Sequence, residues 1–313
     1  MVQASRAATI PAEGLPNRTL AAAAAVLGYA TLIGYTDNYV RVVAAEGGLW
    51  QFHFLRSLMA AAVFFVVAPL LGLDLRPRNL RAVAARSAVH GAAMLIYFGC
   101  LAFLPVAQVA AGLFTAPIFV LLISRFVYGH PLGPARIAAA AVGFLGVVLA
   151  LTPGTDQPLG WASVLPVAAG ALYALGNIAT REWCAGESAA VLTLGFFVAL
   201  GAAGLAGVAV LAAVPLPVAD GTDGFVLRGW IWPSATFWWW TAVQAVGSML
   251  AVGLMVRAYQ LAEASRVAIF EYVILPIAAL WGWLLWGETL GWVAVLGMAM
   301  IVVAGSTIVL RGR

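Results

Sequence analysis

The sequence predicts an all-α integral membrane protein, on three observations. Hydrophobic residues make up 64% of the 313 residues and charged residues only 9%, whereas roughly a quarter of a soluble domain is charged. The mean hydropathy is +1.01. Apolar stretches of about 20 residues, the length that a helix needs to cross a hydrocarbon core about 30 Å thick, recur along the chain. An ordinary soluble protein is therefore excluded.

Ten apolar stretches, separated by polar residues, prolines or glycines, predict ten transmembrane helices. They cover residues 20–43, 50–71, 82–103, 106–127, 134–151, 160–180, 189–213, 237–260, 264–286 and 290–310. The polar segment 1–19 is expected to be a cytoplasmic tail. The apolar run after it is too long for the hydrophobic region of a signal peptide, so we expect it to be retained as the first helix. Residues 215–234 predict an extramembrane loop with room for a short interfacial helix.

The arginines predict the orientation. When the loops are assigned alternately to two sides, 13 of the 16 basic residues, Arg86 among them, fall on the side of the N terminus, whereas Arg41 and Arg228 fall on the other side. Because cytoplasmic loops are enriched in arginine, both termini are expected to be cytoplasmic, in a bacterial inner membrane. Eleven of the 12 tryptophans, all but Trp183, fall at or toward the opposite side, as an interfacial belt would.

Catalytic chemistry has little support. The chain contains no lysine, which excludes a Schiff base, a P-loop and a lysine base. Cys100 and Cys184 are too few for a disulfide framework or a cysteine zinc site. His-Glu-x-x-His, paired aspartates on one helix and Gly-x-Ser-x-Gly are all missing from the sequence. We therefore expect neither an intramembrane enzyme nor a metal or cofactor.

An internal repeat divides the chain into halves. Residues 129–133 (GHPLG) match residues 287–291 (GETLG) at an offset of 158, and residues 107–110 match residues 265–268 at the same offset. A third match pairs two polar helix ends: Asn38 with Arg41, and Asn177 with Arg181. Apolar helices rich in glycine can resemble one another by chance, but three matches in one order favour a true repeat.

The repeat unit contains five helices, over residues 20–151 and 160–310. Because five is odd, the two halves are expected to cross the membrane in opposite senses, related by a pseudo-two-fold axis in the membrane plane.

Together these motifs resemble the EamA-type transporters of the drug/metabolite transporter superfamily. The resemblance extends from about residue 20 to the end of the chain. It is carried by Phe54-Leu55-Arg56, Asn177 with Arg181, residues 264–268 (ASRVA), Phe270-Glu271-Tyr272 with Pro276, and Gly287-Glu288. Bacterial amino-acid and metabolite exporters look most similar. The resemblance implies a central cavity lined by helices 1, 3, 4, 6, 8 and 9, with alternating access. His130 stands where the family would place a carboxylate, so the two halves need not act alike.

Ionisable groups inside apolar helices are the first candidates for function, because each costs about 2.5–3.5 kcal/mol to insert. Glu271 lies about seven residues inside the ninth helix, and its alternative is a structural ion pair with Arg56 or Arg257. Asp37 lies near the external end of the first helix, where an interfacial polar cluster is the alternative. His90 is about eight residues into the third helix. If transport is coupled to protons, we rank Glu271 first, Asp37 second and His90 third.

Polar and aromatic residues that share helix faces complete the candidate set. Met94 and Tyr97 follow His90 at spacings of four and seven, and the pairs Tyr173/Asn177 and Gln244/Ser248 each lie four apart. Such groups suit a zwitterion or amide, but they equally join helices together. Pro117 and Pro276 are candidates for gating because a proline permits a kink. The candidate substrate-binding residues are His90, Met94, Tyr97, Tyr173, Asn177, Gln244, Ser248, Glu271 and Tyr272.

The sequence thus predicts a secondary transporter that exports small, largely neutral metabolites, such as amino acids including aromatic ones. The expected partners are the small-molecule substrate and the lipid bilayer, with no nucleic acid, and a monomer suffices because both halves are in one chain. The expected cavity has no cluster of fixed positive charges, which disfavours sugar phosphates. The alternative is proton-coupled efflux of lipophilic cations, for which an embedded carboxylate would be essential.

Overall fold

The structure, a computed structural model, describes residues 18–100, 104, 106–151, 161–288 and 291–311. Across these residues the chain forms helices and two short 3-10 turns, with no β-strand. The helices are α1 (Thr19–Asp37), α2 (Val40–Glu46), α3 (Leu49–Leu70), α4 (Leu80–Cys100), α5 (Val106–Leu113), α6 (Ala116–Phe126), α7 (Pro134–Leu151), α8 (Val164–Glu182), α9 (Ala189–Ala213), α10 (Ala235–Leu261), α11 (Ala264–Glu271), α12 (Ile274–Trp286) and α13 (Trp292–Arg311). The polar tail expected over residues 1–19 lies almost wholly outside the described residues.

Seven helical segments of the described chain are long and apolar enough to cross a membrane. They are Thr19–Glu46, Leu49–Leu70, Leu80–Cys100, Val109–Phe126, Ala189–Ala213, Ala235–Leu261 and Ala264–Trp286. Two shorter apolar helices, Pro134–Ala150 and Trp292–Thr307, add to them. The protein is therefore an all-helical integral membrane protein.

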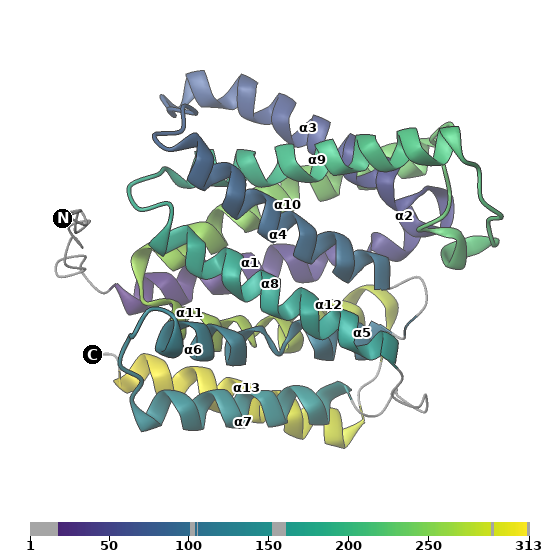
Figure 1. Cartoon of the computed structure of the whole chain (residues 1–313). Coiled ribbons are helices and arrows are strands. Elements are labelled where there is room, and N and C mark those ends of the chain that lie inside the picture. Colours follow the sequence, from purple (N-terminus) through teal and green to yellow (C-terminus); the bar gives the residue numbers. More distant parts are fainter. Residues whose placement is uncertain (1–17, 101–103, 105, 152–160, 289–290, 312–313) are drawn as a thin grey trace, which may run out of the picture.

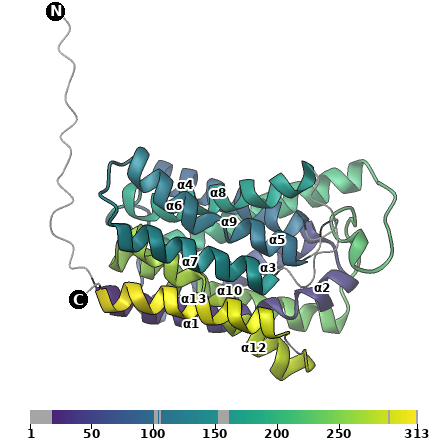
Figure 2. The ribbon, with the colours of Figure 1, turned by 90° about the horizontal axis from the view of Figure 1, so that it is seen from below.

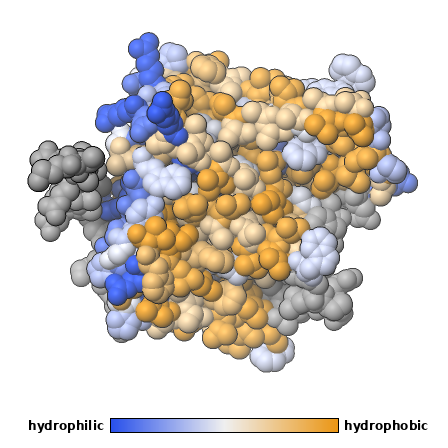
Figure 3. All heavy atoms as spheres, viewed as in Figure 1, coloured by the Kyte–Doolittle hydropathy of each residue, from blue (hydrophilic) through white to orange (hydrophobic). Residues whose placement is uncertain are grey.

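The helices run roughly side by side, and α1 begins at the end of the molecule where α13 finishes (Figures 1 and 2). Two pairs, α3 with α9 and α7 with α13, pack along each other on opposite sides, while α1 packs on α10 and α4 packs on α8 between them (Figure 1). Apolar side chains cover the middle of the face in Figure 3, and hydrophilic ones gather at the end where α1 begins. Exposed apolar side chains such as Phe65 and Val303, 66% and 61% exposed, would face lipid.

Close helix packing depends on small residues. On α9, a Cβ added to Gly204 would lie 2.6 Å from the backbone nitrogen of Phe54 on α3. On α7, a Cβ added to Gly146 would lie 2.6 Å from the carbonyl oxygen of Gly297 on α13. Both outer pairs therefore bring backbones into direct contact.

Two of the expected helices are interrupted near their middle. The helix expected over 106–127 breaks between Leu113 and Ala116, and the one over 264–286 breaks between Glu271 and Ile274. Pro117 and Pro276 lie in the first turn after each break, where a missing N–H is tolerated.

The two breaks lie at equal intervals along the chain. Leu113 and Glu271 are 158 residues apart, as are Ala116 and Ile274. Further on, Gly129 and Gly287, also 158 apart, both adopt left-handed backbone with φ of 70° and 66°. These residues follow α6 and α12, so the chain turns at the same interval after each broken helix.

The connection over 215–234 contains a 3-10 turn, Gly221–Gly224, and is attached to the start of α3. Gln51 exchanges two hydrogen bonds with the backbone of Ile231, at 2.7 and 3.2 Å. Arg228 donates to the carbonyl oxygens of Ala44 and Gly47, at 2.9 and 2.8 Å, which satisfies the end of α2. Arg228 therefore stabilises the connection between this loop and α2, in addition to any effect on membrane topology.

Arg86 corrects one expectation. It was assigned with the arginines of the cytoplasmic surface, but its side chain is only 1% exposed and lies inside the bundle. Its guanidinium donates from Nε to Thr180 Oγ1 at 3.1 Å and from Nη1 to the carbonyl oxygen of Leu192 at 3.0 Å. These contacts join α4 to α8 and α9, so Arg86 supports packing between helices.

Candidate functional site

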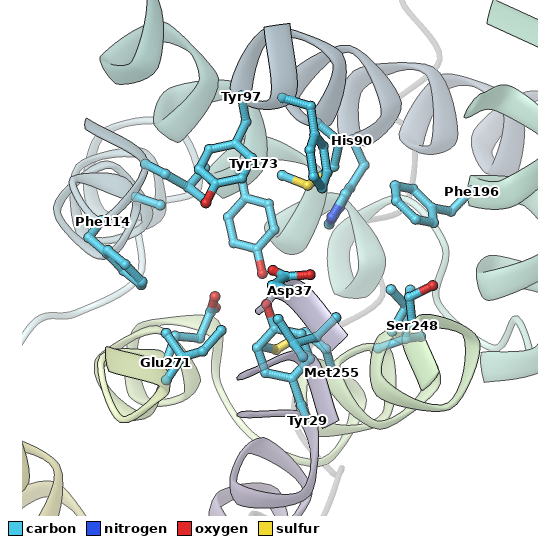
Figure 4. Close-up of a pocket in the computed structure, with 18 of the residues that line it drawn as sticks. Tyr29, Asp37, His90, Tyr97, Phe114, Tyr173, Phe196, Ser248, Met255 and Glu271 are labelled. Carbon is cyan, nitrogen blue, oxygen red and sulfur yellow. The ribbon is translucent and has the colours of Figure 1, made fainter. Parts of the chain in front are cut away.

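A cavity of about 100 Å³ lies between the helices, enough for several water molecules at roughly 10–15 Å³ each. Its walls come from α1, α4, α5, α6, α8, α10, α11 and α12, which belong to the helices expected to line a cavity, and also from α3 and α9. The labelled side chains in Figure 4 converge on it from several sides: Tyr29, Asp37, His90, Tyr97, Phe114, Tyr173, Phe196, Ser248, Met255 and Glu271.

Glu271 is the last residue of α11 and lines the cavity beside the helix break. Its side chain is buried, and Oε1 accepts hydrogen bonds from the hydroxyl of Tyr259 and from Nδ2 of Asn177, the latter at 3.3 Å. Within the described part of the chain, Glu271 forms no ion pair with Arg56 or Arg257. The alternative of a structural ion pair is therefore wrong, and neutral donors hold this carboxylate at the wall.

The break beside Glu271 has a local cause. The ring of a proline crowds the carbonyl four residues earlier and offers no N–H to it, and Tyr272 lies four residues before Pro276. The carbonyl oxygen of Tyr272 instead accepts from the backbone of Leu275 at 3.2 Å. Pro117 stands in the same relation to Leu113, and it lines the cavity whereas Pro276 does not.

His90 lies on an aromatic wall. Its ring centroid is 4.8 Å from that of Tyr173 and 5.1 Å from that of Phe196, both edge-on. Met94 and Tyr97, which share its helix face, also line the cavity. His90 Nδ1 is buried and has no partner among the described residues. This wall can stack an aromatic group and can still donate or accept one hydrogen bond.

Asp37 lines the cavity at the end of α1. Gln244 donates from Nε2 to the carbonyl oxygen of Thr36 at 2.7 Å and to Asp37 Oδ1 at 3.4 Å. Ser248 also lines the cavity, and its hydroxyl donates to the carbonyl oxygen of Gln244. Gln244 therefore orients Asp37 from behind the wall, as Asn177 does for Glu271.

Tyr272 lies apart from the other candidates. Its side chain is fully buried between Val147 and Ile301, next to Gly143, and it is not among the cavity-lining residues. The residues of the cavity wall that sequence reasoning did not single out include Tyr29, Phe98, Phe196 and Met255. Tyr29 could have been found, because it lies eight residues before Asp37, two helical turns along one face.

Two arginines, Arg56 and Arg86, line the same cavity and are 4% and 1% exposed. The cavity was expected to lack clustered positive charge, and this expectation needs correction. The reason lies in the tertiary structure: Arg56 and Arg86 are on the apolar helices α3 and α4, and both side chains point into the bundle. The site therefore presents both signs of charge, with Asp37 and Glu271 as its carboxylates.

The protein crosses the membrane several times, and its buried charged groups converge on an internal cavity. This architecture is typical of membrane transporters. The comparisons agree, since residues 20–152 match the model of the EamA-like transporter family. This match, over the first half of the chain, is consistent with a transporter of the drug/metabolite transporter superfamily.

The relatives are named as transporters of two different compounds. The chain is similar to a riboflavin transporter of Rhizobium johnstonii, with 32% identity over 204 residues, 65% of this chain. It spans only 62% of the length of that relative. It is also similar to the pseudopaline exporter CntI of Pseudomonas aeruginosa, with 25% identity over 88% of this chain and 92% of the relative. A solved crystal structure, described only as that of a protein, superposes with a TM-score of 0.75 at 18% identity, over 95% of this chain and all of the other. This last likeness concerns the fold alone.

Proposed function

We propose that the chain is a secondary transporter that exports amino acids, including aromatic ones, by alternating access. The observation that carries the proposal is the cavity wall, which combines an aromatic surface around His90 and Tyr173 with buried charges of both signs. The aromatic surface suits an apolar side chain, and the charges suit an amino acid's ionised groups.

Alternating access follows from an inverted repeat, which we propose over residues 20–151 and 160–310 with ten membrane-crossing helices. The equal spacing of the two helix breaks and of the two left-handed glycines supports this. Helix packing has the matching pattern: α1 packs on α10 as α8 packs on α4, and α1 packs on α12 as α8 packs on α6. Two halves of similar shape around one site can exchange conformations, which opens the site to each side in turn.

Coupling to protons is assigned to Glu271, with Asp37 and His90 as the second and third candidates. Glu271 lines the cavity next to a break, where a change in backbone geometry is least hindered. A carboxylate in this position can bind a proton on one side of the membrane and release it on the other.

We place the protein in a bacterial inner membrane with both termini cytoplasmic. Exposed arginines such as Arg76, Arg78 and Arg81 near the start of α4 support this orientation. One chain contains the whole cavity, so a monomer is sufficient.

The second candidate is efflux of lipophilic cations, favoured by Asp37 and Glu271 on one aromatic wall, because cations bind aromatic faces. Riboflavin is a third substrate to include, since a relative is named as its transporter.

Transport into proteoliposomes separates these substrates. The purified protein is reconstituted, and uptake of labelled phenylalanine, leucine, riboflavin and tetraphenylphosphonium is measured with and without a pH gradient. We expect saturable amino-acid uptake, inhibited by other aromatic amino acids. Uptake of tetraphenylphosphonium or riboflavin without any amino acid would contradict the proposal.

A further inference from the structure

Arg56 differs from Arg86, the other buried arginine of the cavity, in that its Nε has no hydrogen-bond partner among the described residues. It is on α3, its side chain is 4% exposed, and it lines the cavity. In the described structure, Nε has no hydrogen-bond partner, and the guanidinium forms no ion pair within the 4.0 Å limit. Its one hydrogen bond runs from Nη2 to Nδ1 of His53, at 3.2 Å.

The surroundings of Arg56 make this guanidinium costly without an anion. The rings of Phe52, Phe98 and Phe197 lie 5.0, 5.8 and 5.7 Å from its central carbon. These rings offer weak attraction but no hydrogen-bond acceptor, and a buried charge needs paired, hydrogen-bonded neighbours to offset its lost hydration.

His53 fixes the orientation of the Arg56 guanidinium. An arginine only donates, so His53 Nδ1 must accept and, in the neutral ring, the proton resides on Nε2. The His53 side chain is fully buried, so the contact holds Nη2 on the side of α3. The remaining donors, Nε and Nη1, are left for another acceptor.

Arg86 is the matched comparison. It lines the same cavity and is also buried, but Thr180 and Leu192 accept from its Nε and Nη1 at 3.1 and 3.0 Å. Burial in this cavity therefore does not by itself leave the Nε of an arginine without a partner, as it is in Arg56.

Asp37 has the opposite charge, and it also lacks an ion-pair partner among the described residues. It lines the same cavity, and its one hydrogen bond comes from the Gln244 amide at 3.4 Å. No cation of the described residues lies within ion-pair distance of it. Arg56 and Asp37 thus face one cavity and attract each other across it, but they form no direct ion pair.

We infer that Arg56 binds the carboxylate of the transported substrate and Asp37 its ammonium group, so that the cavity selects zwitterions. Two donors of one guanidinium can bind both oxygens of a carboxylate, which a point charge cannot do as well. The inference rests on the proposed function, because it assigns the two ionic groups of an amino acid to named residues.

Binding to the purified protein tests Arg56 independently of transport. The probes are 3-phenylpropionate and 3-phenylpropanamide, which differ only in the charged group, and the readout is thermal stabilisation in detergent over a concentration series. We expect the wild type to prefer the carboxylate at least tenfold. Arg56→Gln should lose this preference, Arg56→Lys should recover part of it, and Arg86→Gln should keep it despite a lower melting temperature.

The outcomes separate the two proposals. A wild type that does not prefer 3-phenylpropionate, or an Arg56→Gln variant that still does, overturns the role of Arg56 even if amino acids are transported. If the preference for 3-phenylpropionate depends on Arg56 but no amino acid is transported, the anion site is supported and the proposed substrate is rejected. If Arg56→Gln does not fold, Arg56→Lys decides, because loss of the bidentate fork should weaken carboxylate binding while amide binding stays within twofold.

Asp37 is tested with phenethylamine, which has the ammonium group but no carboxylate. Asp37→Asn should weaken binding of phenethylamine at least tenfold and leave 3-phenylpropionate within twofold. Equal binding of phenethylamine by Asp37→Asn and the wild type overturns its part of the inference.

Discussion

Replacing Glu271 with glutamine removes a proton-binding group while preserving the shape of the site. Both hydrogen bonds to Glu271, from Tyr259 and from Asn177, reach the same oxygen, Oε1. A glutamine whose amide oxygen takes that position keeps both partners. Glu271→Gln therefore isolates charge and protonation from geometry.

The change in stability can be bounded from these contacts. A hydrogen bond to a charged group contributes about 1.5–3 kcal/mol and a neutral one about 0.5–1.5 kcal/mol, so the two bonds weaken by about 2–3 kcal/mol in all. Removing a buried charge recovers a desolvation cost of several kcal/mol. Because the terms oppose each other, Glu271→Gln should fold with a free energy of unfolding within about 2 kcal/mol of the wild type.

Glu271→Ala provides the contrast. It leaves the Tyr259 hydroxyl and the Asn177 amide unpaired, at about 1–3 kcal/mol for each buried donor. We therefore expect a loss of roughly 2–6 kcal/mol, seen as a clearly lower melting temperature in detergent. Similar melting temperatures for the alanine and glutamine variants would mean that these donors find other partners.

Two transport modes measured in the same proteoliposomes test the coupling. Exchange of labelled for unlabelled substrate needs no net proton movement, whereas accumulation against a gradient does. Glu271→Gln should retain exchange within about threefold and lose at least 90% of accumulation driven by a pH gradient. Wild-type accumulation in this variant would refute the assignment, and loss of both modes in a folded variant would assign Glu271 to substrate binding instead.

Three further predictions concern packing, topology and an exposed ion pair. Gly204→Val should destabilise the protein by about 1–3 kcal/mol, because its Cβ would lie 2.6 Å from a backbone nitrogen of α3; an unchanged melting temperature would contradict this. In a cysteine-free background, an impermeant thiol reagent added to intact cells should label Asp220→Cys and not Arg76→Cys, and the reverse pattern would invert the proposed topology. Arg41 and Glu288 are 47% and 55% exposed in their 3.1 Å ion pair, so Glu288→Gln should change the free energy of unfolding by at most about 1 kcal/mol, and a larger loss by thermal denaturation would refute this.

Hydropathy located the helices well because a membrane helix is chosen by its apolar length. The stretch expected over 50–71 became α3, Leu49–Leu70, and that over 189–213 became α9, Ala189–Ala213. Hydropathy does not detect the breaks, because the residues around Leu113 and Glu271 lie inside continuous apolar runs. The prolines that follow were the available signal, and their effect falls on the carbonyl four residues earlier.

The candidate site was predictable where one helix carries the pattern. His90, Met94 and Tyr97 share a face by spacing alone, and the structure places all three on the cavity wall. The partners of Glu271 were not predictable in full, because Tyr259 approaches it from another helix. The role of Arg86 was not predictable for the same reason. From the sequence alone, an arginine near a helix end resembles a topology signal, because its neighbours on other helices are unknown.

The proposed halves are alike in backbone and unlike in chemistry, and this difference bears on coupling. Leu113 and Glu271, which the 158-residue interval makes equivalent, both line the cavity at the end of a broken helix. The same interval pairs His130 with Glu288, which lie outside the cavity wall. Equivalent breaks would let both halves bend alike, but only the second half provides a titratable group at its break. A transporter built in this way needs two similar moving parts and a single proton site, which is the arrangement that the exchange and accumulation assays of Glu271→Gln are designed to separate.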